Sequence, residues 1–286
     1  LDRWRDSLLA DPRRTRVWRW LAPTLITLFA FVLRLVNVGD PHNLVFDETY
    51  YVKDAWSQWL LGFPSEWPGG ADARFVAGET DFFPGVGSYV VHPPLGRFFI
   101  GAGMALFGAD SATGWRIAAV VFGTGIVLLV YLFAKTLTGS LVFASVASGL
   151  MAIDGLGIVL SRVALLDVFL TFFIVLALWF VALDRRAALS RWAARAPGET
   201  TWGPVFWNRP WLLAAGAAAG AATAVKWSGL YVIAGIGVYV VIEDALARRR
   251  AGIAQWPMDA ARQGLVSFVL LVPVAVVVYL ASWAGW

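Results

Sequence analysis

The sequence predicts an all-α integral membrane protein built as a helix bundle. Hydrophobic residues make up 59% of the 286 residues and charged residues only 15%, whereas about a quarter of the residues of soluble domains are charged. The mean hydropathy is +0.68. The apolar residues occur in runs of the length that crosses a bilayer as a helix, about twenty residues. We expect about seven spanning helices, at residues 18–37, 115–135, 140–158, 166–183, 211–226, 229–243 and 263–284.

The apolar run at residues 95–108 is interpreted differently because it is short, follows Pro93-Pro94 and contains Arg97. These features favour an interfacial helix over a spanning one. Counting the run as a span would also move the basic segments 184–209 and 248–262 to the outside, against the usual excess of Lys and Arg in cytoplasmic loops. We therefore expect a basic cytoplasmic segment at residues 1–17 and a first extracytoplasmic loop at residues 38–114.

The net charge of +4 and the isoelectric point near 9.6 come from basic residues between the apolar runs. This distribution is typical of the cytoplasmic loops of membrane proteins, so no nucleic-acid partner is expected. The lack of cysteine excludes disulfides and a thiol nucleophile. With two histidines and no cysteine, a soft metal site is not expected, and an acidic Mg²⁺ or Mn²⁺ site is the weaker alternative. We expect no cofactor.

Ionisable residues gather on the predicted outer face, where such residues often mark a functional site. Asp47 and Glu48 lie among aromatic residues in NLVFDETYYVKDAWSQW, although a solvated acidic turn or a helix start would also explain the pair. The cations could instead snorkel to the headgroups or form plain ion pairs. Glu243 and Asp244, beside the arginines at 248–250, are interpreted as a charge-balanced helix end. The candidate site residues are Arg34, Asp47, Glu48, His92, Arg97, Arg116, Asp154, Arg162, Asp167 and Lys226.

Carboxylates and cations on one outer face suit a reaction between an anionic lipid and an acceptor outside the cytoplasm. A polyprenyl phosphate leaves as an anion without a general acid, and Arg or Lys would stabilise its developing charge. The acceptor hydroxyl is a poor nucleophile and needs a base, for which one carboxylate is enough. In an inverting displacement the base works on the side of the sugar opposite the leaving group. This chemistry predicts a carboxylate on one side of the site and cations on the other.

Several stretches together resemble the protein O-mannosyltransferases, which are lipid-dependent glycosyltransferases of the GT-C fold. The resemblance implies a GT-C-type catalytic module at residues 18–286 that transfers mannose from polyprenyl-phosphate mannose to Ser or Thr of exported proteins, with inversion and without a metal. It also implies a bacterial plasma-membrane enzyme that lacks the C-terminal helices of the longer family members. The matching stretches are RLVNVGDPHNLVFDETYYVKDA, HPPLGR, GWRIAAVVFG, MAIDGLGIVLSRVALLDVFLTFF and AVKWSGLY.

The same resemblance implies roles for the candidate residues. Asp47 would be the general base, and Glu48 would help to shape the acceptor site. The residues that would contact the donor phosphate or its lipid are His92, Arg97, Arg116, Arg162 and Lys226. The residues that would support the site are Arg34, Asp154 and Asp167. The expected partners are polyprenyl-phosphate mannose, the lipid bilayer, Ser/Thr-containing secreted or membrane proteins, and the protein-export machinery.

Two alternatives stay open from the sequence. Another GT-C transferase, using a different lipid-linked sugar or a lipid or glycan acceptor, would have a similar set of outer charges. A secondary transporter is less favoured, because its charges would lie near the membrane midplane on broken helices and its halves would show repeat symmetry. In this chain the charges gather at one face.

Overall fold

The computed structural model describes residues 12–194 and 200–286. Most of the predicted cytoplasmic segment 1–17, and Arg195 in the second basic segment, therefore lie outside the described residues. Within the described ranges the regular structure is helical, apart from two isolated β-bridges that join Ser65 to Gly87 and Thr200 to Ile253. The predicted all-α fold is confirmed.

Among the described residues, five helices are long and apolar enough to cross a membrane. They are α2 (Pro12–Leu35), α6 (Ala112–Thr138), α9 (Leu166–Ala193), α11 (Gly229–Arg250) and α12 (Trp256–Ala281). The other predicted spans correspond to shorter helices, namely α7 (Leu141–Ile153) with α8 (Gly155–Leu160), and α10 (Pro210–Val225). A helix thus forms at every predicted apolar run, while the number of crossings stays a prediction.

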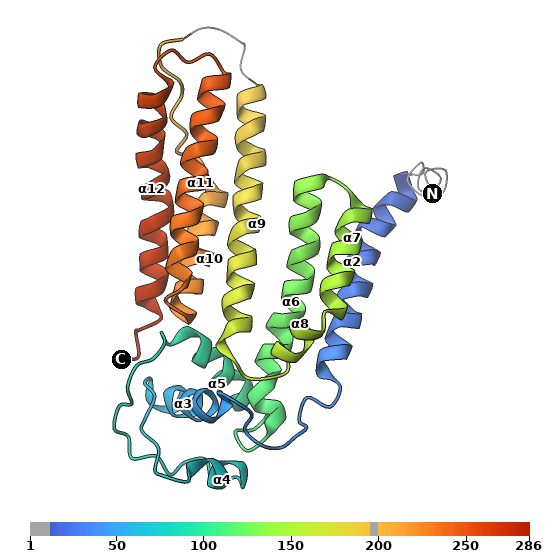
Figure 1. The fold of residues 1–286 in the computed structure, drawn as a ribbon, viewed down its shortest axis with the longest axis vertical. Helices are drawn as coiled ribbons and strands as arrows, with labels where there is room; N and C mark the ends of the chain where they lie inside the picture. Colours follow the sequence, from blue (N-terminus) through green and yellow to red (C-terminus); the bar gives the residue numbers. More distant parts are fainter. Residues whose placement is uncertain (1–11, 195–199) are drawn as a thin grey trace.

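The bundle consists of two groups of helices that meet where α6 packs against α9 (Figure 1). One group contains α2, α6 and α7, and the other contains α9 to α12. The helices of the predicted outer loop cover the lower end of the bundle in this view: α3 (Glu48–Leu61), α4 (Ala71–Val76) and α5 (Leu95–Phe107). The run predicted as a short separate helix at residues 95–108 is α5, which has 13 residues.

Aromatic side chains fix α5 to the bundle. The Phe99 ring lies 4.5 Å from Phe122 of α6 and 5.5 Å from Phe169 of α9, measured between ring centroids. Gln58 of α3 donates a hydrogen bond to the Pro94 carbonyl, at 2.9 Å, just before α5 begins. The outer-loop helices therefore form one body with the ends of α6 and α9, and this body carries the candidate site.

Backbone contact between small residues brings α10 close to α12. A Cβ added at Gly216 would lie 2.5 Å from the Leu271 carbonyl oxygen, and one added at Gly220 would lie 2.5 Å from that of Ala275. Close helix approach through small residues is typical of membrane bundles, where lipid tails remove most of the hydrophobic drive for association.

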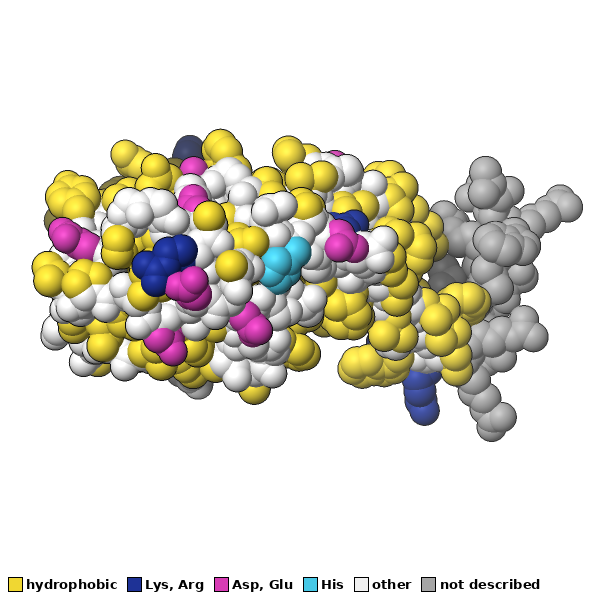
Figure 2. Space-filling view, turned by 90° about the horizontal axis from the view of Figure 1, so that it is seen from below, with side chains coloured by type: hydrophobic (Ala, Val, Ile, Leu, Met, Phe, Trp, Pro, Cys, Tyr) yellow, Lys and Arg dark blue, Asp and Glu magenta, His cyan; other side chains and the backbone are white. Residues whose placement is uncertain are grey.

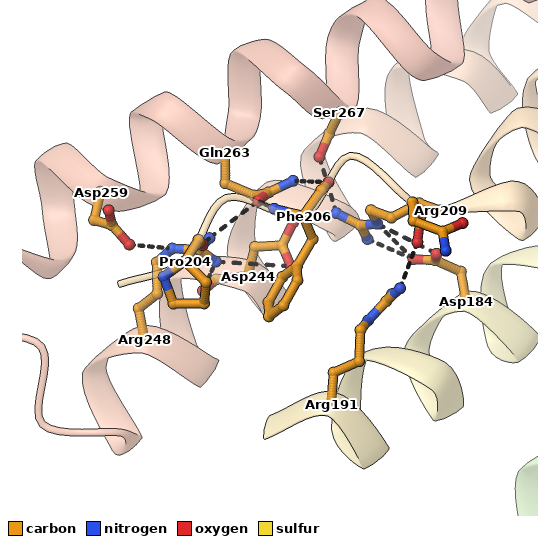
Figure 3. Close-up of polar contacts among 11 residues, drawn as sticks. Asp184, Arg191, Pro204, Phe206, Arg209, Asp244, Arg248, Asp259, Gln263 and Ser267 are labelled. Carbon is orange, nitrogen blue, oxygen red and sulfur yellow. Dashed lines mark hydrogen bonds and ion pairs between the residues drawn. The ribbon is translucent and has the colours of Figure 1, made fainter. Parts of the chain in front are cut away.

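A buried ionic cluster joins α9 to α12 at the end of the bundle away from α3 (Figure 3). We call it the far-end cluster, and it contains Asp184, Arg209, Asp244, Arg248 and Asp259. The Arg209 guanidinium bonds both Asp184 and Asp244, while Arg248 donates from Nε to Asp259 at 2.7 Å. The expectation of a plain charge-balanced helix end at 243–250 was incomplete, because Asp244 and Arg248 are buried and tie helices together.

Candidate active site

A cavity of about 530 Å³ lies within the outer-loop region. It is formed by one face of α3 and by the segments around residues 65–67 and 88–97. Figure 2 views this end of the molecule and shows acidic, basic and histidine side chains among apolar ones. Among the predicted site residues, three line the cavity: Asp47, His92 and Arg97.

Asp47 lies immediately before the first turn of α3, and its backbone carbonyl accepts hydrogen bonds from Tyr50 and Tyr51, each at 3.0 Å. Its carboxylate has no hydrogen-bond or ion-pair partner among the described residues. The preceding Phe46 has φ of 55°, a left-handed conformation that is unusual for a bulky residue. Such local strain clusters at functional sites. The chain thus presents an unpartnered carboxylate to the cavity.

Glu48 lies next to Asp47 in sequence but has the opposite environment, because it is completely buried. Its Oε1 accepts from Arg116 Nε at 2.8 Å and from the Ala164 N–H at 2.8 Å. Its Oε2 accepts from Arg116 Nη2 at 2.9 Å and from the Val45 N–H at 2.9 Å. Glu48 does not line the cavity, so the geometry gives no support to the expected contact with an acceptor.

Arg116, at the start of α6, is only 2% exposed. Besides Glu48 it bonds the carbonyls of Val38, Pro41 and Asn43, at distances of 2.8 to 3.0 Å. These contacts use every N–H that a guanidinium possesses. No donor is left for a phosphate, so the expected phosphate contact of Arg116 does not fit this structure. Arg116 instead holds the chain that leads into Asp47.

Arg97, in the first turn of α5, is 3% exposed and borders the cavity. It donates from Nη1 to Asp54 Oδ2 at 3.2 Å and from Nη2 to the His92 carbonyl, while its Nε has no partner. Burial raises the pKa of Asp54 to about 6, against the opposing effect of Arg97 and Lys53. Burial, Lys226 and Arg97 lower the pKa of His92, so its imidazole is neutral at pH 7.

Lys226, at the end of α10, forms an ion pair with Asp167, with Nζ at 2.8 Å from Oδ1 and 2.9 Å from Oδ2. Neither residue lines the cavity, yet both act electrostatically on His92: Lys226 lowers its pKa and Asp167 raises it. The pair therefore places one further cation near the cavity's His92 side.

The other three predicted residues fix backbone away from the cavity. Arg162 donates to the Asn37 carbonyl at 3.0 Å, in the chain that follows α2. Arg34 is fully buried and bonds the Ala152 carbonyl at 3.2 Å. Asp154 accepts from the Gly157 N–H at 2.6 Å and caps α8. This agrees with a supporting role for Arg34 and Asp154, whereas Arg162 does not reach the cavity.

The prediction from sequence missed Asp54 and Tyr51, which line the cavity with Asp47. Burial and the nearby carboxylate of Asp47 raise the pKa of Tyr51 to about 12. The spacing of 47, 51 and 54 puts the three residues on one face of a helix, and this periodicity could have indicated them. Among the described residues, no group of three or more His, Asp or Glu side chains is arranged to hold a metal ion.

The fold and this cavity define a multi-pass helical membrane protein with an ionisable site in its first interhelical loop. Residues 77–283 match the PMT family, described as dolichyl-phosphate-mannose-protein mannosyltransferase, and the chain belongs to this family. The family resemblance seen in the sequence is thereby confirmed.

Curated relatives and a solved structure agree with this assignment. The chain is 36% identical over 281 residues to the polyprenol-phosphate-mannose--protein mannosyltransferase of Mycolicibacterium smegmatis (strain MKD8), covering 95% of this chain and 51% of the relative. It is 35% identical over 280 residues to the protein of that name from Mycobacterium tuberculosis (strain CDC 1551 / Oshkosh), covering 95% and 50%. The chain thus spans about half the length of these relatives.

The structure also resembles a chain of the S. cerevisiae protein O-mannosyltransferase Pmt1-Pmt2 complex bound to the sugar donor. The TM-score is 0.67 at 21% identity, and the match covers 92% of this chain and 33% of that one. The chain shares the fold of that protein, so the predicted GT-C-type bundle is confirmed.

Proposed function

We propose that the protein transfers mannose from polyprenyl-phosphate mannose to Ser or Thr hydroxyls of exported proteins, on the extracytoplasmic face of a bacterial plasma membrane. The observation that carries the proposal is the unpartnered carboxylate of Asp47 in a cavity that also holds Arg97 and His92. Family membership supports the donor and the reaction class, since the curated relatives are named polyprenol-phosphate-mannose--protein mannosyltransferase. The predicted topology, with a cytoplasmic N-terminus and seven crossings, belongs to the same proposal.

In the proposed reaction, Asp47 takes the proton from the acceptor hydroxyl as its oxygen attacks the anomeric carbon. The new C–O bond forms on one side of the sugar while the bond to the phosphate oxygen breaks on the other, which inverts the anomeric centre. The polyprenyl phosphate leaves as an anion and needs no proton. A base within hydrogen-bond reach of the hydroxyl typically contributes about 10²- to 10⁴-fold in rate.

The cationic side of the site would be Arg97, with Lys226 as a second cation near His92. Arg97 keeps an unpartnered Nε, and its pairing with Asp54 holds the guanidinium in place. Cations placed where charge develops stabilise the transition state most strongly in a site that excludes water. His92 is neutral at pH 7 and could bond a phosphate oxygen or a sugar hydroxyl without adding charge.

Glu48 and Arg116 would act as positioning residues in this scheme. Together they connect the chain before α3 to the starts of α6 and α9, since Glu48 accepts from Ala164 and Arg116 donates to Val38, Pro41 and Asn43. In this proposal, positioning roles take the place of the direct roles expected for Glu48 and Arg116 from the resemblance. The two adjacent carboxylates thus have different roles in this scheme: Asp47 acts at the reacting atoms, and Glu48 fixes the backbone around Asp47.

The experiment that tests the proposal uses the protein in lipid nanodiscs with polyprenyl-phosphate mannose and a Thr-containing peptide. We expect the peptide to gain the mass of one hexose, which a mannosidase releases, and the Asp47→Asn variant to lower the rate of product formation by about 10²- to 10⁴-fold. Parallel reactions with polyprenyl-phosphate glucose and with a glycolipid acceptor distinguish the other members of the GT-C class. Glycosylation only from another donor, or only of the lipid acceptor, would overturn the mannosyl-to-protein assignment.

A further inference from the structure

An extended segment beside the cavity is paired along one edge only. Residues 64–66 and 86–88 form a short antiparallel ribbon, in which Glu66 donates to the Val86 carbonyl at 2.8 Å and Ser88 donates to the Pro64 carbonyl at 2.9 Å. We call residues 86–91, which begin in this ribbon and continue beyond it, the free-edge segment. In an antiparallel pair, alternate residues direct their backbone N–H and C=O groups to opposite edges. Gly87, which lies opposite Ser65, therefore directs its groups away from residues 64–66, and Tyr89 follows just beyond the paired residues.

The outward backbone groups of the free-edge segment have no partners among the described residues. Neither Gly87 nor Tyr89 makes a backbone hydrogen bond there. Unpaired backbone groups in the hydrocarbon of a bilayer cost several kcal/mol each. This edge must therefore face water or a partner that supplies hydrogen bonds, and the bilayer core is excluded as its covering.

The composition of the free-edge segment makes this edge unusually open to pairing. Its sequence, VGSYVV, has no charge and no proline and contains residues that favour strands. Proteins usually block such edges with lysine, proline, a bulge or a covering helix. Here Tyr89 is 87% exposed, and Ser88, Tyr89 and Val91 also line the cavity that contains Asp47.

We propose that the acceptor polypeptide binds as an added strand along the free-edge segment and so presents a Ser or Thr side chain to the cavity. The inference rests on the proposed function, since it names how that reaction's acceptor is held. Strand addition takes its affinity from main-chain hydrogen bonds, and side-chain pockets on alternate residues add selectivity. The substrate class is therefore an extended, unfolded segment with little dependence on sequence beyond the hydroxyl residue.

The first test is a backbone N-methyl scan of a fluorescent Thr-containing heptapeptide of alanine and valine, with the wild-type protein in nanodiscs. Strand addition predicts an alternating result, because only every second N–H of the peptide faces the edge. Methyl groups at those positions should raise the peptide Kd and KM about tenfold each, and those at the intervening positions should have little effect. A flat profile, or no binding of any peptide, would overturn the inference.

The second test is a pair of variants at Gly87. Gly87→Ala keeps the outward N–H, and its Cβ would meet only Phe63 Cδ2, at an ordinary 3.9 Å. Gly87→Pro removes that N–H. We expect Gly87→Pro to raise the peptide Kd about tenfold, while Gly87→Ala binds as wild type and both variants keep the wild-type Tm and donor affinity. Equal peptide binding by the two variants would contradict the inference.

The proposed transfer and the proposed strand addition are distinguished by different outcomes. If the peptide binds with the alternating pattern but gains no hexose, the strand addition stands and the proposed transfer does not. If the peptide is mannosylated but N-methylation gives a flat profile, the transfer stands and the strand addition does not.

Discussion

The far-end cluster and the cavity use the same kinds of side chains in opposite ways. In the far-end cluster each charge meets an opposite charge: Arg209 bonds Asp244 at 2.6 Å, and Arg248 bonds Asp259 at 2.7 Å (Figure 3). In the cavity, the Asp47 carboxylate has no partner among the described residues, and Nε of the buried Arg97 has none either. Unpaired polar groups near a low-dielectric interior are costly. Paired charges therefore tie the helices together at the far end, whereas the unpartnered carboxylate of Asp47 agrees with the proposed role of the cavity.

The strongest test of this contrast removes the free carboxylate. Asp47→Asn should lower the transfer rate by about 10²- to 10⁴-fold, because the acceptor hydroxyl loses its base. The Tm should stay at the wild-type value, since no contact of the carboxylate is lost. Asp40→Asn, an exposed carboxylate in the same loop, serves as the matched control and should transfer normally. Wild-type turnover by Asp47→Asn would refute the base assignment.

The far-end cluster should show the reverse behaviour. Arg209→Leu leaves Asp184 and Asp244 buried without their cation, and removing one member of a buried pair costs about 3–5 kcal/mol of unfolding free energy. The rate per folded molecule should not change, because the cluster lies at the other end of the bundle. The control is Arg185→Leu, whose pair with Glu243 is 43% exposed on the arginine side and should be worth less than about 1 kcal/mol. Denaturant unfolding in detergent micelles measures both, and equal losses would contradict the contrast.

A third prediction concerns Arg97 and Arg162, for which the sequence predicted the same contact with the donor. Arg97→Ala should raise the donor KM about 10- to 100-fold, the effect of losing a charged hydrogen bond to phosphate. Arg162→Ala should leave the donor KM near the wild-type value, because Arg162 bonds the Asn37 carbonyl and does not line the cavity. Steady-state kinetics at saturating peptide gives both values. A large increase in the donor KM of Arg162→Ala would support the donor contact expected for Arg162 from the sequence.

The smallest expected effect is the pH dependence caused by Asp54, whose pKa in the folded protein is raised from 3.8 to about 6 by burial. Because the folded state holds this proton more tightly than the unfolded state, stability falls as the pH rises from about 4 to about 6 and is level above that range. Asp54→Asn should lack this component, and the difference between the two curves should change by about 2 kcal/mol between pH 4.5 and 7. Parallel curves for the two proteins between pH 4.5 and 7 would show that Asp54 does not titrate in this range.

The sequence predicts the helices well and the charge pairs poorly, for physical reasons. A bilayer requires long apolar helices, so hydropathy alone places a helix at each predicted run, although α9 continues to Ala193, beyond the predicted end at 183. Glu48 pairs with Arg116 and Arg209 pairs with Asp244, and in each pair the two residues lie far apart in the chain. No local sequence pattern indicates such pairs. Charged residues therefore appear as candidates for one site when several of them only fix backbone.

Asp47 could be identified from the sequence because it lies beside Glu48 in a stretch that resembles the family. The different environments of the two carboxylates could not be predicted. Adjacent residues at a helix start point in different directions, and no sequence pattern indicates that Glu48 rather than Asp47 meets Arg116. The free-edge segment was also missed, because so short a ribbon in a loop has no periodicity to detect.

The contacts of Glu48 also bear on the order in which the site forms during synthesis. Its carboxylate needs Arg116 and the N–H of Ala164, residues that are synthesised long after it. A chain emerging from the ribosome therefore cannot complete the setting of Asp47 until the start of α9 has been made. Shorter nascent chains already contain Asp47 but lack the contacts that fix its position, so under the proposed function the site is completed late in membrane insertion.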